Sequence, residues 1–353
     1  MNLLRPRIAR FDHYTHPLFD ALLQQAPEVE LQVHRMPATL AEAAQALQGA
    51  HAYHVTAAKD ELAAPAFVTQ ALLQACPQLL CASSSGAGFD PIDVPACTRA
   101  GVAVVNQSGA NAVSVGEHAM GLIIGLAHRI PESDRRLRRE RGFSREELTG
   151  RELEGKTLGV VGIGNTGRRL AALAGAFGMR VLAHDPLLDE AEIRHRGAEP
   201  VSLDALLERS DFVSLHCPRD ASTRNLFGAA AFARMKPGAC FITTARGGIH
   251  DEAALHAALQ SGHLAGAGLD VWEPEPPALD SPLLRHESVI ATFHTAGVTH
   301  ECRERMARWA AEQLLGVLRG ERPPRLVNPE VWPAWCRRFE AILGRVPQAS
   351  GQP

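Results

Sequence analysis

The feature that most constrains the fold is a repeated alternation of short apolar segments with segments of helical periodicity. Stretches with 3.6-residue spacing, such as 251–260 and 307–318, separate the apolar segments. The apolar, strand-like segments form two series, 8–11, 31–34, 52–56, 79–84 and 102–106, and then 157–162, 180–185, 212–217, 240–245, 265–271 and 288–293. This alternation is typical of parallel sheets covered by helices on both faces. Because there are too many strands for one sheet, we predict an α/β protein with two doubly wound, Rossmann-like domains.

Composition excludes several classes of function. The 353 residues include 36 basic and 39 acidic ones, so the whole molecule has no electrostatic attraction to nucleic acid or to a membrane surface. Seven cysteines without a CxxC pair favour reduced thiols and a cytoplasmic location, and the first residues lack the apolar stretch of a signal peptide. The 16 histidines show no zinc-binding spacing. We therefore expect a small-molecule partner and no metal.

A glycine-rich segment, LGVVGIGNTG at 158–167, indicates a dinucleotide site. It places Gly162, Gly164 and Gly167 in GxGxxG register between an apolar strand and a helical segment. Gly162 permits the tight turn, Gly164 lets a pyrophosphate approach the backbone, and Gly167 lets the helix pack on the strand. The free N–H groups at the start of the helix would then face the phosphates.

An acidic residue follows at the distance expected for recognition of the adenosine ribose. Asp185 ends the next apolar segment, eighteen residues after Gly167. A carboxylate there accepts hydrogen bonds from the ribose hydroxyls and repels a 2′-phosphate, which favours NAD over NADP. The simpler alternative is a turn residue before Pro186.

Three further residues follow strands of the second series. Arg246 comes after 240–245, Glu275 after 265–271, and His294 after 288–293. Ligands bind at the carboxyl ends of such strands. Arg246 can hold a carboxylate, His294 can transfer a proton, and Glu275 can fix the tautomer of His294. Each residue alone is also compatible with a solvated loop, but the set suits hydride transfer between a nicotinamide and a 2-hydroxy or 2-oxo acid.

Longer stretches of the chain carry a resemblance to a known family. They are SSGAGFDPID (84–93), NQSGANAVSVGEHAMGLIIGLAHR (106–129), ELEGKTLGVVGIGNTG (152–167), HCPRDASTR (216–224), ARGGIHDEAAL (245–255), GLDVWEPEPP (268–277) and HTAG (294–297). Over residues 50–330 the chain resembles the D-isomer-specific 2-hydroxyacid dehydrogenases, which include phosphoglycerate, glycerate and D-lactate dehydrogenases.

The resemblance implies roles for individual residues. It makes Arg246 the substrate arginine and His294 with Glu275 the proton relay, and it places Asp270 at the nicotinamide carboxamide. It implies that backbone N–H groups near Ala87 and Gly88 bind the substrate carboxylate. The cofactor residues that it implies are Gly162, Gly164, Asn165, Thr166, Gly167, Asp185, Cys217, Pro218, Thr223, Thr244, Ala245, Arg246, Asp270, His294 and Gly297.

The resemblance also implies a domain organisation. Residues 1–112 with 300–353 would form a flavodoxin-like, substrate-binding domain, and 113–299 an NAD-binding Rossmann domain, with the active site in the cleft between them. It further implies a homodimer with the helix from Ser114 to His128 in the contact.

Departures from the family pattern leave the substrate open. Phe293 stands where many members have proline, Asn165 stands where many have arginine, and Arg219 replaces a usual leucine. Lys59 could reach the far end of a substrate, or it could be a solvated lysine. Two alternative functions remain: an NAD(H)-sensing binding protein like the C-terminal-binding-protein corepressors, and a phosphite-type dehydrogenase.

Overall fold

The computed structural model describes residues 5–348 and divides the chain into two compact units. Unit 1 consists of Met1–Asn111 and His300–Pro353, and unit 2 is the continuous segment Ala112–Thr299. Each unit contains one fully parallel sheet with helices on both faces. Within the described residues, no helix is both long and apolar enough to cross a bilayer.

The sheet of unit 1 has five strands in the order β2-β1-β3-β4-β5. The strands are β1 (Arg7–Phe11), β2 (Glu30–His34), β3 (Ala52–Val55), β4 (Cys81–Ser84) and β5 (Ala103–Val105). The helices are α1 (Pro17–Gln24), α2 (Leu40–Ala46), α3 (Gln70–Ala75), α4 (Val94–Arg99), α13 (His300–Arg319) and α14 (Trp332–Leu343), with short 3₁₀ turns η1 (Ala64–Ala66) and η3 (Pro329–Val331). The direction of strand addition reverses between β1 and β3, so the switch point of this sheet lies there.

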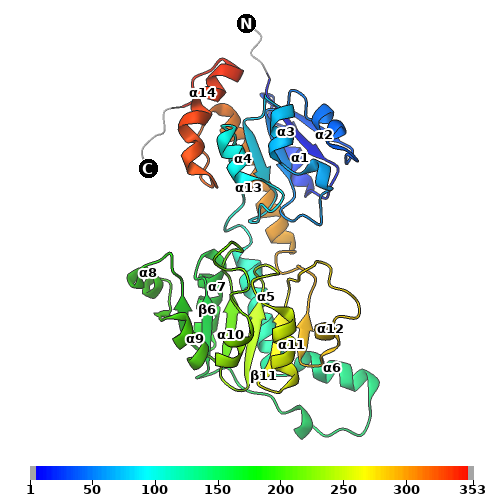
Figure 1. Cartoon of the computed structure of the whole chain (residues 1–353), viewed down its shortest axis with the longest axis vertical. Helices are drawn as coiled ribbons and strands as arrows, with labels where there is room; N and C mark the ends of the chain where they lie inside the picture. The colour runs from blue at the N-terminus through cyan, green and yellow to red at the C-terminus, as the bar shows by residue number, and fades with distance from the viewer. Residues whose placement is uncertain (1–4, 349–353) are drawn as a thin grey trace. The chain divides into compact units, whose positions relative to one another are not determined.

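The two faces of this sheet bury separate apolar clusters. One cluster joins the sheet to α1, α13 and α14, and its largest member is the fully buried Trp335. The other joins the sheet to α2, α3 and α4 around Tyr53. In Figure 1 the C-terminal helices, orange and red, lie beside the blue and cyan strands of the same unit. The chain therefore returns to its first sheet after unit 2 is complete.

The sheet of unit 2 has seven strands in the order β12-β11-β10-β9-β6-β7-β8. The strands are β6 (Thr157–Val161), β7 (Arg180–His184), β8 (Glu199–Pro200), β9 (Phe212–Leu215), β10 (Ala239–Thr243), β11 (Leu264–Leu269) and β12 (Val289–Ala291). The helices are α5 (Ala112–Ala127), α6 (Ile130–Arg139), α7 (Asn165–Ala176), α8 (Glu190–His195), α9 (Leu203–Arg209), α10 (Ala229–Arg234), α11 (Glu252–Gln260) and α12 (Pro282–Arg285), with the turn η2 (Glu146–Leu148). The central strands are buried on both faces, which explains their continuous apolar sequences.

The predicted fold class is confirmed, and two details differ from expectation. The strand β8 was not predicted, because two residues at the edge of a sheet, one of them proline, leave no periodic signal. The helix expected from Ser114 begins two residues earlier, at Ala112, and Ser114 lies inside it. Its hydroxyl lies 2.9 Å from the hydroxyl oxygen of Thr299.

Candidate active site

The glycine-rich loop joins β6 to α7 at the carboxyl edge of the unit 2 sheet. Gly162 has a positive φ of 87°, and a Cβ there would lie 2.8 Å from the backbone nitrogen of Cys217. A Cβ on Gly164, in contrast, would meet no atom within 4 Å. No side chain caps the start of α7, where Asn165 and Thr166 form the first turn. The loop thus packs tightly on its protein side and leaves open space beside uncapped N–H groups, as an anion site requires.

Asp185 is held at the end of β7 by the glycine-rich loop itself. One carboxylate oxygen accepts the N–H of Ile163 at 3.0 Å, and the other accepts the N–H of Leu187 at 3.1 Å. A carboxylate has about four acceptor positions, so two remain for hydroxyl donors. The half-buried Asp185 is therefore fixed in place beside the loop and is still able to accept further hydrogen bonds.

The segments after β9 and β10 supply further candidate cofactor contacts. The hydroxyl of Thr223 donates to the carbonyl of Pro218 at 2.7 Å and so closes the loop after β9. Burial raises the pKa of the Cys217 thiol to about 11, so this side chain is a neutral thiol at physiological pH. Thr244 is 8% exposed, and its buried hydroxyl oxygen has no hydrogen-bond partner among the described residues. An orphaned buried hydroxyl at this edge fits a bound dinucleotide.

His294 and Glu275 form a direct pair in unit 2. The imidazole Nδ1 lies 2.9 Å from a carboxylate oxygen of Glu275, and the other Glu275 oxygen accepts the N–H of Trp272 at 2.9 Å. Because Nδ1 is engaged by a carboxylate, the tautomer and ring orientation of His294 are set, and Nε2 is the nitrogen available to a substrate. Phe293, beside it, is 55% exposed.

The pair shifts the pKa values of both members. Burial alone would lower the pKa of His294, but the hydrogen bond and negative charge of Glu275 outweigh it and raise this pKa above its usual value. Burial alone would raise the pKa of Glu275, but the hydrogen bond and charge of His294, with smaller contributions from the Trp272 N–H and Arg246, lower it. The arrangement therefore favours an imidazolium beside a carboxylate.

Arg246 lies in the loop that follows β10. One of its guanidinium nitrogens donates to the carbonyl of Ala245 at 2.7 Å. Its positive charge acts on both Glu275 and His294, which places it in the same electrostatic neighbourhood. The residue after Arg246 has to be glycine for a steric reason, because a Cβ on Gly247 would lie only 1.9 Å from the carbonyl oxygen of Trp272. The loop of Arg246 thus packs directly against the segment that carries Glu275.

Asp270 is a fully buried carboxylate that organises the loop carrying His294. It accepts the Thr292 hydroxyl at 2.6 Å and the N–H groups of Thr295 and Ala296 at 2.9 and 3.0 Å. His294 has a positive φ of 48°, and its N–H donates to the carbonyl of Asp270 at 2.7 Å. The left-handed backbone of His294 is therefore held in place by Asp270.

Sequence reasoning missed two residues around this loop. His118, on α5, lies 3.0 Å from the Thr292 hydroxyl and 3.6 Å from the Asp270 carboxylate. Trp272, just after β11, donates its indole N–H to the carbonyl of Thr292 at 3.0 Å. His118 stands in the GEHAMG segment of an expected helix, but no spacing rule connects it with a residue 174 positions away.

Ala87 and Gly88, the predicted carboxylate-binding residues, lie in a turn of unit 1 after β4. The carbonyl of Ala87 accepts the side-chain amide of Asn106 at 2.7 Å, and the carbonyl of Gly88 accepts the hydroxyl of Ser84. Both carbonyls are therefore engaged, while the N–H groups of these two residues make no hydrogen bond within the described part of the chain. Lys59, in contrast, lies 5.7 Å from the ring centroid of Phe67.

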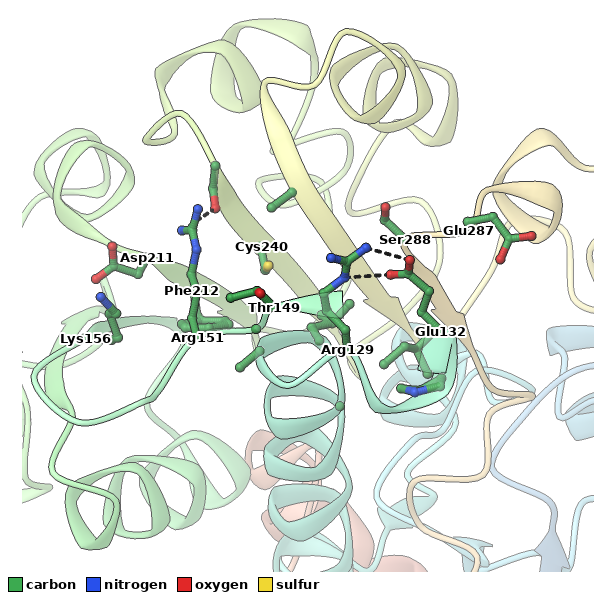
Figure 2. A pocket seen from close by; sticks show the side chains of 18 of the residues that line it. Arg129, Glu132, Thr149, Arg151, Lys156, Asp211, Phe212, Cys240, Glu287 and Ser288 are labelled. Carbon is green, nitrogen blue, oxygen red and sulfur yellow. Dashed lines mark hydrogen bonds and ion pairs between the residues drawn. The ribbon is translucent and has the colours of Figure 1, made fainter. Parts of the chain in front are cut away.

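Unit 2 also contains a cavity of about 270 Å³. It lies at the edge of the unit 2 sheet opposite to the edge that carries Arg246, Glu275 and His294. Figure 2 shows its polar lining: Arg129 faces Glu132, and Lys156 stands beside Asp211. Lys156 and Asp211 precede β6 and β9, at the amino ends of the strands. The cavity contains none of the predicted site residues, so size alone does not identify the candidate active site. Within the described residues, no group of three or more His, Cys, Asp or Glu side chains forms a metal site.

Comparison with known proteins connects this geometry to one family. Residues 120–296 match the family described as D-isomer specific 2-hydroxyacid dehydrogenase, NAD binding domain. A glyoxylate reductase of Korarchaeum cryptofilum is 40% identical over 263 residues, which are 74% of this chain and 79% of that protein. A D-3-phosphoglycerate dehydrogenase of Archaeoglobus fulgidus is 39% identical over 74% of this chain, which spans only 50% of that longer protein.

Similarity extends to solved structures. The crystal structure of a glyoxylate reductase from Paecilomyes thermophila matches 93% of this chain and 99% of its own, with a TM-score of 0.81 and 28% identity. The glycine-rich loop, the carboxylate after β7 and the orphaned Thr244 hydroxyl fit the dinucleotide that the matched domain binds. The chain therefore belongs to the D-isomer specific 2-hydroxyacid dehydrogenase family and carries its NAD-binding domain.

Proposed function

We propose that this protein is an NAD-dependent D-2-hydroxyacid dehydrogenase that works as a 2-oxo acid reductase, with Arg246 binding the substrate carboxylate and His294 with Glu275 acting as the proton relay. The observation that carries the proposal is the 2.9 Å contact of the His294 imidazole with Glu275, whose segment packs at Trp272 against the loop of Arg246. The three groups supply what this reaction needs from a protein: a cation for the carboxylate and a positioned acid for the carbonyl oxygen.

Each residue has a separate role in the proposed reduction. Bound NADH supplies the hydride that reduces the carbonyl carbon. Arg246, which stays charged at working pH, holds the carboxylate and so orients the carbonyl. His294 donates the Nε2 proton to the carbonyl oxygen, and Glu275 stabilises the imidazolium beforehand. In the reverse direction the same nitrogen accepts the proton of the hydroxyl group.

The cofactor residues follow the same division. Gly162, Gly164 and Gly167, with Asn165 and Thr166, would receive the pyrophosphate at the start of α7. Asp185 would accept the ribose hydroxyls, and Thr244 would offer its hydroxyl to the dinucleotide. For Cys217, Pro218, Thr223, Ala245, Asp270 and Gly297, contact with the cofactor remains part of the proposal.

The test is a screen of 2-oxo acids with NADH and with NADPH, followed at 340 nm, with chiral analysis of the product. The proposal predicts NADH oxidation with at least one acid and a D-hydroxy acid as product. Tight NADH binding without turnover across a broad panel would contradict the proposal and favour a nucleotide-sensing role.

We also propose a homodimer, in which helices α5 and α6 lie in the contact. The helix α6 has no buried residue, and its Ile130 and Leu137 are 53% and 64% exposed. The proposal places these two side chains in the contact, where a second copy of the chain would cover them. The cytoplasmic location expected from the cysteines belongs to the same proposal.

A further inference from the structure

Unit 1 contains a cavity of its own at the switch point of its sheet. It has a volume of about 120 Å³ and is lined by residues that follow β1, β3 and β4 together with the first turns of α13. In a sheet with this strand order, ligands bind outside the carboxyl ends of the strands, where the direction of strand addition reverses. The cavity is larger than the roughly 30 Å³ of a water molecule and smaller than the roughly 300 Å³ of the smallest pockets for whole ligands. The cavity therefore has room for one end of a small molecule but not for a whole ligand.

The cavity adjoins the turn that contains Ala87 and Gly88. Ser85, in the same turn, is one of its lining residues. Gly86 is packed so closely on the loop after β3 that a Cβ there would lie 2.8 Å from the side chain of Ala57. A 2-oxo acid whose carboxylate binds the N–H groups of Ala87 and Gly88 would therefore have this cavity beside it for its far end.

The cation that lines the cavity has no acidic partner. Arg303, in the first turn of α13, is half-buried, and it makes no ion pair or hydrogen bond within the described part of the chain. Its guanidinium lies 5.2 Å from the ring centroid of Tyr14, which also lines the cavity. Several other half-buried arginines, such as Arg129 with Glu132 and Arg196 with Glu192, have carboxylate partners. Glu61 is the single carboxylate among the lining residues, and it is solvent-exposed. Because solvent and salt screen its charge, its electrostatic repulsion of an anion in the cavity is weakened.

A second group in the cavity also lacks a partner. Both ring nitrogens of His13 are buried, and neither makes a hydrogen bond within the described residues. Burial, with the charge of Arg10 as a second cause, lowers the pKa of His13 to about 4, so the ring is neutral at physiological pH. A neutral imidazole offers one N–H donor. His54, which also lines the cavity, is engaged instead with the Ser83 hydroxyl at 3.1 Å and stacked on Phe19.

We infer that this cavity binds a second anionic group, a carboxylate or a phosphate, at the far end of the 2-oxo acid, with Arg303 as its counter-ion and His13 as a hydrogen-bond donor. The inference rests on the proposed function, because it assigns the substrate class of that same reaction. It makes the preferred substrate a short acid with charge at both ends. It also assigns the distal role to Arg303 in place of Lys59, which does not line the cavity.

The experiment compares acids of similar length with and without a second charge. The kcat/KM of the wild-type protein is measured with NADH for 2-oxobutyrate and 2-oxovalerate, for oxaloacetate and 2-oxoglutarate, and for 3-phosphohydroxypyruvate. We expect the acids with a second charge to exceed the neutral ones by about tenfold or more. The carboxylate and phosphate members of the panel then show which anion the cavity prefers.

Variants assign the preference to the cavity. Arg303→Gln should remove the preference for the second charge and leave kcat/KM for the neutral acids within about threefold, and His13→Asn should weaken the same preference less. The matched control is Arg308→Gln on the same helix, because Arg308 is exposed and paired with Glu304. An unchanged preference in Arg303→Gln, or a wild-type preference for neutral acids, would overturn the inference.

A binding measurement separates this inference from the proposed function. Glutarate and butyrate, which cannot be reduced, are titrated calorimetrically into the NADH-loaded protein and into NADH-loaded Arg303→Gln. Tighter binding of glutarate that depends on Arg303 supports the cavity assignment even if no acid is turned over, in which case only the proposed function fails. Equal binding of the two acids, together with turnover of neutral 2-oxo acids, would leave the proposed function standing and contradict the cavity assignment.

Discussion

The Glu275–His294 pair concentrates the chemistry of the candidate site in one hydrogen bond. Its physical effect is to keep the imidazole protonated at a pH where a solvated histidine would have lost its proton. Reduction of a 2-oxo acid consumes that proton, so the rate should be high below the raised pKa and should fall as the pH rises through it.

The first prediction concerns Glu275→Gln. The amide can still contact the imidazole but carries no charge to stabilise the imidazolium, so the falling limb of the pH profile for 2-oxo acid reduction should move to lower pH. At neutral pH we expect roughly a tenfold to hundredfold loss in kcat, with little change in NADH affinity. The measurement is kcat against pH for wild type and variant. An unshifted limb would show that Glu275 does not set the protonation of His294.

At the level of single residues, the sequence pointed to candidate catalytic residues but not to the side chains that support them. Arg246, Glu275 and His294 could be named because each follows a strand and parallel strands share one carboxyl edge. The roles of His118 and Trp272 could not be predicted, because their contacts with Thr292 depend on how α5 and the 292–296 loop pack. Such contacts join residues far apart in sequence and leave no local pattern.

At the level of elements, the β6–α7 unit and β7 together form the candidate nucleotide site. The glycine-rich loop is fixed to the end of β7 by the hydrogen bond from Ile163 to Asp185. The sequence predicted this unit because the glycine register, the strand before it and the helix after it all agree. It predicted the strands of both sheets from their apolar runs, but it missed β8, which is too short to produce such a run.

The second prediction concerns Asp185. Asp185→Asn removes the charge that repels a 2′-phosphate and keeps an oxygen that can accept the Ile163 N–H. The ratio of kcat/KM for NADH to that for NADPH should therefore fall by about fivefold or more, since two charges a few Å apart interact by about 1 kcal/mol even in water. Asp185→Ala, which also loses the loop contact, should weaken both cofactors further. A ratio unchanged in Asp185→Asn would mean that the carboxylate does not discriminate between a ribose 2′-hydroxyl and a 2′-phosphate.

At the level of the whole molecule, buried neutral histidines link stability to pH. Burial is the main cause that lowers the pKa of His13, His216 and His250 to about 4 in each case. Their pKa values in the unfolded chain are near the ordinary 6.5. Between these values the unfolded state binds more protons than the folded state, so the free energy of unfolding must fall as the pH falls.

The third prediction follows from that linkage. The melting temperature should decrease between about pH 6.5 and pH 4, and it should be insensitive to these three groups above pH 7. His250→Gln, at a residue with both ring nitrogens buried and unpartnered in the described chain, should flatten this dependence. The measurement is calorimetric unfolding across the pH range. A melting temperature constant from pH 7 to pH 4.5 in the wild-type protein would contradict the burial of neutral rings.

The fourth prediction concerns assembly. If α6 lies in a homodimer contact, Leu137→Glu should convert a species of twice the chain mass into a monomer, because it places a charge in an apolar contact. The control is Leu279→Glu in the same unit, at a leucine that is 93% exposed. The measurement is light scattering coupled to size-exclusion chromatography. A wild-type monomer, or the same mass in both variants, would exclude this contact.

The most direct test of the whole account is the rate of hydride transfer in a single turnover. NADH-saturated wild type, Arg246→Ala and His294→Asn are mixed with a 2-oxo acid that the wild type reduces, and absorbance at 340 nm is followed by stopped flow. We predict that all three proteins bind NADH with similar affinity, while both variants transfer hydride roughly 10²–10⁴-fold more slowly than wild type. Two results would contradict the assignment of Arg246 and His294 to the substrate. One is a wild-type rate of hydride transfer in the two variants, and the other is a loss of NADH affinity as large as the loss of rate.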